Sequence, residues 1–101
     1  MSTELVEWAV RQTAVSHRAR VVLVYMAELT RDRATGDIPA RTYVGGWERL
    51  GLAVVDPDLA MTPESRHAVT GRLVGELVAG GCVKVVDNPG RGHTQWYQVG
   101  P

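Results

Sequence analysis

Apolar residues recur at helical spacing in the stretch 17–33, HRARVVLVYMAELTRDR, which charged residues flank at both ends. The repeating positions are Ala19, Val22, Met26 and Leu29. Ser16 directly precedes this stretch and suits the N-cap position. The valines within it would also fit a buried strand, but about 16 residues without a breaker favour a helix. We predict the central helix of the protein here.

A second apolar stripe follows Ser65 and predicts an amphipathic helix of roughly 15 residues. Its members are Val69, Leu73 and Leu77, four residues apart, with Val74 and Val78 beside them. Gly80 and Gly81 end this helix. Thr62 and Ser65 are candidates for its N-cap.

Two shorter stretches also place apolar residues on one helical face. The stretch 3–14, TELVEWAVRQTA, predicts a short helix or an ordered arm that caps the core through Trp8. The stretch 46–55, GWERLGLAVV, predicts a short helix. The residues that share a face are Leu5, Trp8 and Gln12 in the first stretch, and Trp47, Leu50 and Val54 in the second.

Alternation of apolar and polar positions predicts two strands near the end of the chain, in 82–87, CVKVVD, and in 94–99, TQWYQV. The residues expected on one face are Val83 and Val85 in the first strand, and Tyr97 and Val99 in the second. The segment 88–93 between them contains a proline and two glycines, which let the chain reverse sharply. We therefore expect a β-hairpin.

The connecting segments are rich in breakers. The segment 34–46, ATGDIPARTYVGG, is expected to be a connection with a short strand around Ile38, and DPDLAMTPES, 56–65, a turn. Three helices followed by a hairpin make an α+β fold, and 101 residues suffice for a single hydrophobic core. We expect a single domain, 1–101, with an N-terminal arm or helix (1–15), a three-helix core (16–80) and a hairpin (81–99).

The sequence contains no recognisable catalytic or metal-binding motif. The histidines His17, His67 and His93 are scattered over three predicted elements, without Asp or Cys at ligand spacing. Cys82 is the single cysteine, so it has no partner for a disulfide within the chain, and we expect it to be a small buried residue. We expect no enzymatic activity, no cofactor and no metal.

The longest apolar run, 21–27, is far shorter than the roughly 20 residues of a membrane span. The first residues, MSTELVEW, carry acids where a secretory signal carries bases. We therefore expect a cytoplasmic protein with no membrane partner. Eleven basic and eleven acidic residues give a formal charge of zero, so binding to a nucleic acid would depend on a local patch.

Three segments resemble a known family. SRHAVTGRLVGELVAGGCVKVV leading into GRGHTQWYQV, with YVGGWERLGLA before them, is similar to winged helix-turn-helix DNA-binding domains. More narrowly, the chain resembles the replication-initiator-like and regulator-like members on phages, plasmids and integrated elements of high-GC bacteria. The resemblance covers residues 17–99. It departs from the family at VVDPDLAMTPE, which is longer than the usual tight turn between the second and third helices.

This resemblance implies a three-helix core with a hairpin wing, and a protein that binds double-stranded DNA to regulate transcription or replication of a phage or mobile element. The third helix would enter the major groove, and the 88–93 wing would touch the backbone or the minor groove. The residues implied in DNA binding are Ser65, Arg66, His67, Thr70, Gly71, Arg72, Lys84, Arg91 and His93.

The helical pattern gives an independent reason for part of this set. If Val69 and Leu73 face the core, then Arg66, His67, Thr70 and Gly71 lie on the open side of the first two turns. The N–H groups near Ser65 and Arg66 would hold a phosphate. The same polar residues would also fit an ordinary solvated helix face, and Glu64 would repel a phosphate.

A nucleotide-binding loop is a poorer interpretation of 88–93. Gly90 and Gly92 are followed by Gln95 where a dinucleotide fingerprint needs glycine, and no helix follows.

A small DNA-binding module gains affinity from a second copy, so a homodimer through Trp8 and the first helix is a further hypothesis. The alternative function is a winged-helix module that binds a host or phage protein instead of DNA. Zero net charge and the acids Glu64, Glu76 and Asp87 favour it. A positive ridge joining Arg66, Arg72, Lys84 and Arg91 would instead favour DNA.

Overall fold

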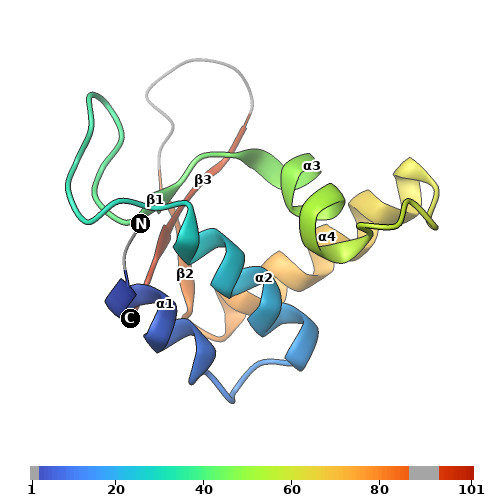
Figure 1. Ribbon diagram of the computed structural model, residues 1–101, viewed down its shortest axis with the longest axis horizontal. Coiled ribbons are helices and arrows are strands. Elements are labelled where there is room, and N and C mark those ends of the chain that lie inside the picture. The colour runs from blue at the N-terminus through green and yellow to red at the C-terminus, as the bar shows by residue number, and fades with distance from the viewer. Residues whose placement is uncertain (1–2, 87–93) are drawn as a thin grey trace.

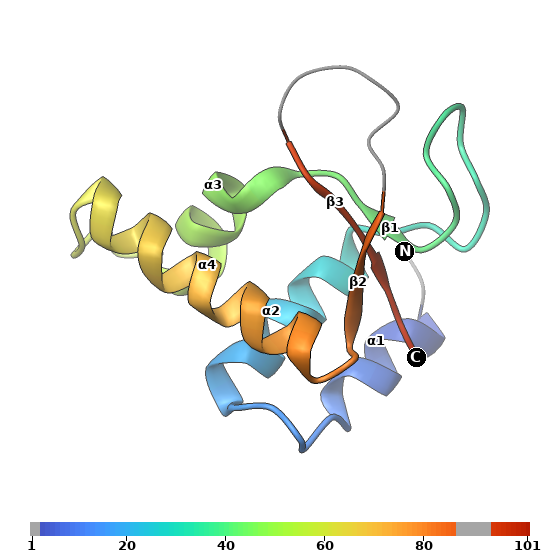
Figure 2. The same ribbon diagram turned by 180° about the vertical axis from the view of Figure 1, so that it is seen from behind.

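The computed structural model describes residues 3–86 and 94–101. Within these residues the helices and strands form an α+β fold. They are α1 (Thr3–Val10), α2 (His17–Glu28), β1 (Thr42–Tyr43), α3 (Gly46–Leu50), the π-helical turn η1 (Gly51–Val55), α4 (Pro63–Ala79), β2 (Val83–Val86) and β3 (Trp96–Val99). Figures 1 and 2 show α2 in the middle, with α1 on one side of it and α3 and α4 on the other. No helix among the described residues is both long and apolar enough to cross a bilayer.

The central helix α2 forms for the reasons that the sequence indicates. The Oγ of Ser16 accepts a hydrogen bond from the backbone N–H of Ala19 at 3.2 Å, which confirms the predicted N-cap. The helix ends at Glu28, before the expected 33. It ends there because the N–H of Thr30 donates to the Ala27 carbonyl, to which the Thr30 hydroxyl also donates, so both groups close the last turn. The fully buried face of α2 consists of Ala19, Val22, Leu23, Met26 and Ala27.

The first stretch forms a helix, α1, rather than an arm. Leu5 and Ala9 are its buried residues, whereas Trp8 is half-buried at the margin of the core. The helix ends at Val10, and the Gln12 side chain donates back to the Trp8 carbonyl. Trp8 therefore packs against the margin of the core, and its side chain stays partly exposed.

The predicted helix 46–55 is present but changes its winding halfway. Leu50 is buried, and Trp47 and Val54 pack against the core beside it, which confirms the predicted face. From Gly51 the turns widen, and the N–H of Asp56 reaches back five residues to the Gly51 carbonyl at 2.8 Å. Gly51 faces the Arg66 side chain so closely that a Cβ would lie 2.9 Å from Cδ of Arg66. This approach requires a glycine.

The sheet has the order β1-β3-β2, and both pairings are antiparallel. The predicted hairpin of β2 and β3 is confirmed, with Val83 opposite Val99 and Val85 opposite Tyr97. Tyr97 and Val99 are buried as expected, but Val85 is 45% exposed because β2 is an edge strand. Cys82, just before β2, is buried as predicted.

The strand expected around Ile38 is wrong. Ile38 forms an isolated bridge with Thr35, and the strand that joins the sheet is Thr42–Tyr43. Tyr43 fixes this position because its ring is buried in the core and its hydroxyl donates to the Gly46 carbonyl at 2.7 Å. Burial raises the pKa of Tyr43 to about 12, which keeps that donor protonated.

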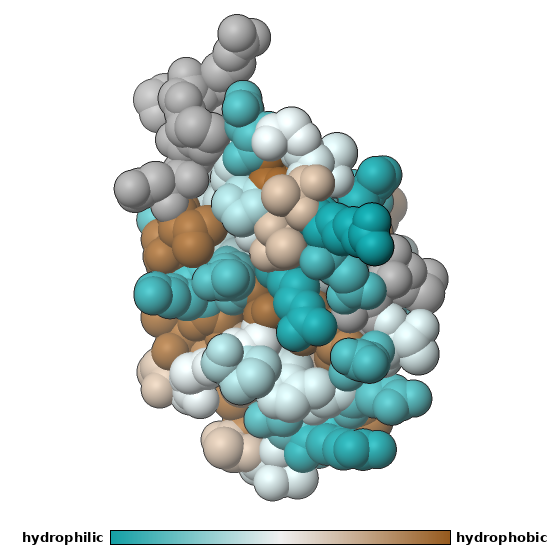
Figure 3. All heavy atoms as spheres, turned by 90° about the vertical axis from the view of Figure 1, so that its left-hand side faces the viewer, coloured by the Kyte–Doolittle hydropathy of each residue, from teal (hydrophilic) through white to brown (hydrophobic). Residues whose placement is uncertain are grey.

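The face seen in Figure 3 is largely hydrophilic, with apolar side chains gathered toward its left.

Candidate nucleic-acid interface

Helix α4 begins earlier than the pattern suggests. Thr62 is its N-cap, with its side-chain oxygen accepting from the Ser65 N–H at 3.2 Å, and Pro63 occupies the first helical position. The Arg66 N–H donates to the Thr62 carbonyl at 2.9 Å. The N–H groups of Ser65 and Arg66 are therefore bonded within the helix. The expectation that they would hold a phosphate is wrong.

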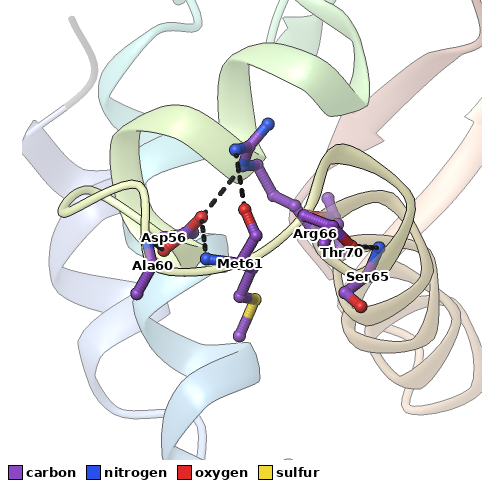
Figure 4. A network of polar contacts seen from close by, with 7 residues as sticks. Asp56, Ala60, Met61, Ser65, Arg66 and Thr70 are labelled. Carbon is purple, nitrogen blue, oxygen red and sulfur yellow. Dashed lines mark hydrogen bonds and ion pairs between the residues drawn. The ribbon is translucent and has the colours of Figure 1, made fainter.

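Arg66 does not lie on the open side of α4. Its Nε donates to Oδ2 of Asp56 at 3.1 Å, and its Nη2 donates to the Met61 carbonyl at 3.4 Å (Figure 4). The side chains are 14% exposed for Arg66 and 3% for Asp56. Arg66 thus fastens the connection after η1 to α4, and its charge is compensated inside the protein.

Asp56 organises the whole connection that departs from the family pattern. Its two carboxylate oxygens accept from the backbone N–H of Ala60 at 2.8 Å and of Met61 at 3.0 Å. Burial alone would raise the pKa of Asp56, but the N–H groups of Met61 and Ala60 and the Arg66 guanidinium outweigh it, so the pKa is lowered. Asp56 was not among the residues that the sequence predicted for the site. Its signal was an acid directly before a proline at a helix end, which is typical of side-chain capped turns.

Thr70 and Gly71 are also removed from the expected open side. Thr70 is completely buried, and its hydroxyl donates to the Arg66 carbonyl at 2.8 Å. The six-membered ring of Trp47 covers Gly71, where a Cβ would lie 2.6 Å from Cζ3 of that ring. The sequence pattern misplaced these residues because it located the apolar stripe of α4 from large side chains alone. The buried face in fact includes Thr70.

Trp47 connects three elements, α3, α4 and β3. Its Nε1 donates to the Tyr97 hydroxyl at 2.9 Å, and that hydroxyl donates to Oε1 of Gln95, also at 2.9 Å. On its other side the Trp47 ring lies 5.0 Å from the ring of His67, between centroids. The contacts hold α3, α4 and β3 in one arrangement. They position His67, which is exposed, at the edge of α4 nearest the hairpin.

The outward face of α4 is what remains accessible. Its exposed residues include Glu64, Ser65, His67, Ala68, Arg72 and Gly75. Among the described residues, nothing forms a hydrogen bond or ion pair with the Arg72 side chain that would compensate its charge. A hollow of about 650 Å³ adjoins this face, with Trp47, Glu48, His67 and Gln95 among the residues that line it.

The remaining predicted residues lie apart from this face. Lys84 is exposed on β2, opposite Gln98, on the side of the sheet away from the buried Val83. Glu76 accepts hydrogen bonds from the N–H and the hydroxyl of Ser16, so it belongs to the junction of α4 with α2. Arg91, His93 and Asp87 lie outside the described residues. With Arg66 compensated by Asp56 and Lys84 on the far side of the sheet, the described residues form no continuous positive ridge.

Comparisons with protein-family models, with curated proteins and with solved structures found no match to this chain.

Proposed function

We propose that this protein binds double-stranded DNA as a winged helix-turn-helix domain. The order α2, β1, α3, α4, β2, β3 and the sheet order β1-β3-β2 are compatible with that layout. The observation that carries the proposal is the open face of α4. The helix is held on its other sides by α2, α3 and η1, while its outward residues have no covering element among those described. A helix presented in this way fits a B-DNA major groove of about 12 Å.

The structure changes the residues to which we assign this binding. Arg72 is the cation on the outward face and is our candidate for a guanine or phosphate contact. His67 and Ser65 are exposed toward the N-terminal end of the same helix and are polar contacts in the proposal. Arg66, Thr70 and Gly71 act as positioning residues because they hold α4 in place without being exposed.

The proposed wing is the segment 88–93, with Arg91 and His93 on the DNA backbone or minor groove. The residues that follow this segment, Thr94 and Gln95, line the same hollow as His67 of α4, which supports a wing beside that edge of the helix. The proposed biological role, control of transcription or replication on a phage or mobile element, follows from the sequence resemblance.

The test is a fluorescence-anisotropy titration against duplexes from the region upstream of the protein's own gene, at about 50 and 200 mM salt. We expect binding that weakens with salt and differs between fragments. Arg72→Ala should weaken binding about tenfold or more, since a base or phosphate contact contributes about 1–3 kcal/mol. Arg11→Ala is the matched control, because Arg11 is exposed beyond the end of α1 and does not belong to the outward face of α4. Equal effects of the two variants would contradict the docking of α4.

A second candidate function is a protein-binding module, and one observation favours it. The outward face of α4 pairs the acid Glu64 with the single cation Arg72, and the residues between and beyond them, Ala68 and Gly75, are small. Such a face has little electrostatic attraction for DNA. If the titration shows no salt-sensitive DNA binding at micromolar protein, protein binding becomes the favoured function.

A homodimer through α1 remains a proposal. Trp8 is half-buried against its own core, which leaves less of its surface for a partner, while Val10 is 55% exposed. Sedimentation that shows a monomer at the concentrations of the titration would remove this proposal.

A further inference from the structure

The hydrogen bonds that begin at Trp47 fix the direction of a side-chain amide. Nε1 of Trp47, which can only donate, bonds the Tyr97 hydroxyl at 2.9 Å, and that hydroxyl donates to Oε1 of Gln95 at 2.9 Å. If the amide were turned over, the hydroxyl would face two N–H donors, and its own proton would have no acceptor among the described residues. Tyr97 is 1% exposed, so this proton would be buried without a partner, which is unfavourable. The carbonyl end of Gln95 therefore faces Tyr97.

The amide nitrogen of Gln95 is left on the open side. Gln95 is exposed, and nothing among the described residues accepts a hydrogen bond from its Nε2. Its carbonyl oxygen is engaged with a buried hydroxyl, whereas its two N–H groups are available to a ligand. The fold thus makes a glutamine, which can both donate and accept, act as a donor.

Gln95 lies beside the helix to which we assign DNA binding. The Trp47 ring, from which these hydrogen bonds begin, lies 5.0 Å from the ring of His67 on α4, between centroids. His67 and Gln95 line the same hollow of about 650 Å³. Figures 1 and 2 both show the start of β3, which Gln95 precedes, beside the chain that enters α3. A duplex held by His67 and the outward face of α4 would therefore lie against this hollow.

Such an amide binds hydrogen-bond acceptors. DNA offers phosphate oxygens and, in the major groove, N7 and O6 of guanine and O4 of thymine. The bidentate pairing of glutamine with adenine needs the side-chain carbonyl as well, and that of Gln95 is engaged with Tyr97. Glu48 also lines the hollow, and its charge repels a phosphate. A base edge therefore suits the hollow better than a phosphate.

We propose that Gln95 contacts DNA by donating from Nε2 to a hydrogen-bond acceptor of the duplex, on a base edge or a phosphate. Trp47 and Tyr97 are positioning residues, because they set the direction of this amide. The inference rests on the proposed binding of DNA by α4, to which it adds a contact from the sheet.

The test is the anisotropy titration on two variants with the same charge change. Gln95→Glu keeps an oxygen for the Tyr97 hydroxyl but replaces the outward donors by a carboxylate oxygen, so it should weaken binding about tenfold or more. Gln98→Glu is the matched control, because Gln98 is exposed on the face of β3 opposite to the buried Tyr97. Its charge is screened by solvent, and it should weaken binding less than about threefold.

A neutral variant identifies the acceptor. Gln95→Met has a similar length and no donor, so it should weaken binding about three- to tenfold. Duplexes with single base-pair replacements distinguish the two kinds of acceptor. A base-edge contact means that the variant loses the preference at one base pair, whereas a phosphate contact means an equal loss on every duplex.

NMR of the side-chain amides tests the contact in the unsubstituted protein. Added duplex should shift the two Nε2 protons of Gln95 and leave those of Gln98 in place.

Two results would overturn this inference and leave the proposed function standing. One is an equal effect of Gln95→Glu and Gln98→Glu on a protein that binds DNA. The other is Gln95 amide protons that do not shift at saturating duplex. An unsubstituted protein that binds no duplex would instead contradict the proposed function itself, and this inference with it.

Discussion

Two glycines one turn apart on α4 have opposite environments. A Cβ at Gly71 would lie 2.6 Å from the Trp47 ring, whereas a Cβ at Gly75 would meet nothing within 4 Å. Gly71→Ala should therefore lower the free energy of unfolding by about 1–3 kcal/mol, the usual effect of overpacking. Gly75→Ala should raise it by up to about 1 kcal/mol, because alanine is the better helix former. Urea unfolding of the two variants checks this prediction, and a loss of stability in both would contradict it.

Asp56 makes the stability of the protein depend on acid pH. Its pKa in the folded protein lies below the ordinary value of 3.8, so its stabilising contribution is fully present above that value. It is lost as the pH falls through the lower folded pKa. Asp56→Asn should reduce stability near neutral pH and weaken its decline in acid.

The urea midpoint, measured from pH 6 to 2, is the appropriate quantity. The matched control is Asp58→Asn, an exposed acid in the same connection, which should keep the acid dependence of the unsubstituted protein. If Asp56→Asn leaves the acid dependence unchanged, the bonds of this carboxylate to Ala60, Met61 and Arg66 do not control it.

At the scale of elements, the start of α4 shows which of the two N-cap candidates, Thr62 and Ser65, caps the helix. Thr62 occupies the N-cap position and accepts the Ser65 N–H, and Ser65 is exposed within the first turn. Thr62→Ala should cost about 1 kcal/mol of stability, the usual effect of removing a cap. Ser65→Ala should change it by less than about 0.5 kcal/mol, as an exposed substitution does. Thermal unfolding of both variants measures the difference, and equal losses would contradict the assigned cap.

The types of the main elements could be predicted because each depends on local patterns. Ser16 indicated the start of α2, and the apolar stripe predicted α4. The alternation of apolar and polar residues predicted β2 and β3. The boundaries were less predictable. Strand β1 is two residues long, and its place depends on its pairing with β3 and on the buried Tyr43, neither of which a local pattern contains.

At the scale of the whole molecule, Trp47 connects helices and sheet. Its indole N–H bonds the Tyr97 hydroxyl and its ring covers Gly71. Trp47→Phe should lower the free energy of unfolding by about 1–3 kcal/mol, through the lost hydrogen bond and the smaller ring. Trp8→Phe is the matched control, since Trp8 is half-buried at the margin of the core, and should cost less than half as much. Similar losses in chemical unfolding would contradict this role of Trp47.

The sequence by itself determined an α+β domain, its helical and hairpin segments and most of its buried residues, because hydrophobic periodicity and capping act over a few neighbouring positions. The tertiary structure decided which polar residues of α4 are accessible. Arg66 is compensated by Asp56, ten positions earlier, and Gly71 is covered by Trp47, twenty-four positions earlier. No local pattern contains such pairings, because they arise only when the chain packs, and a buried cation needs a partner wherever the fold brings one.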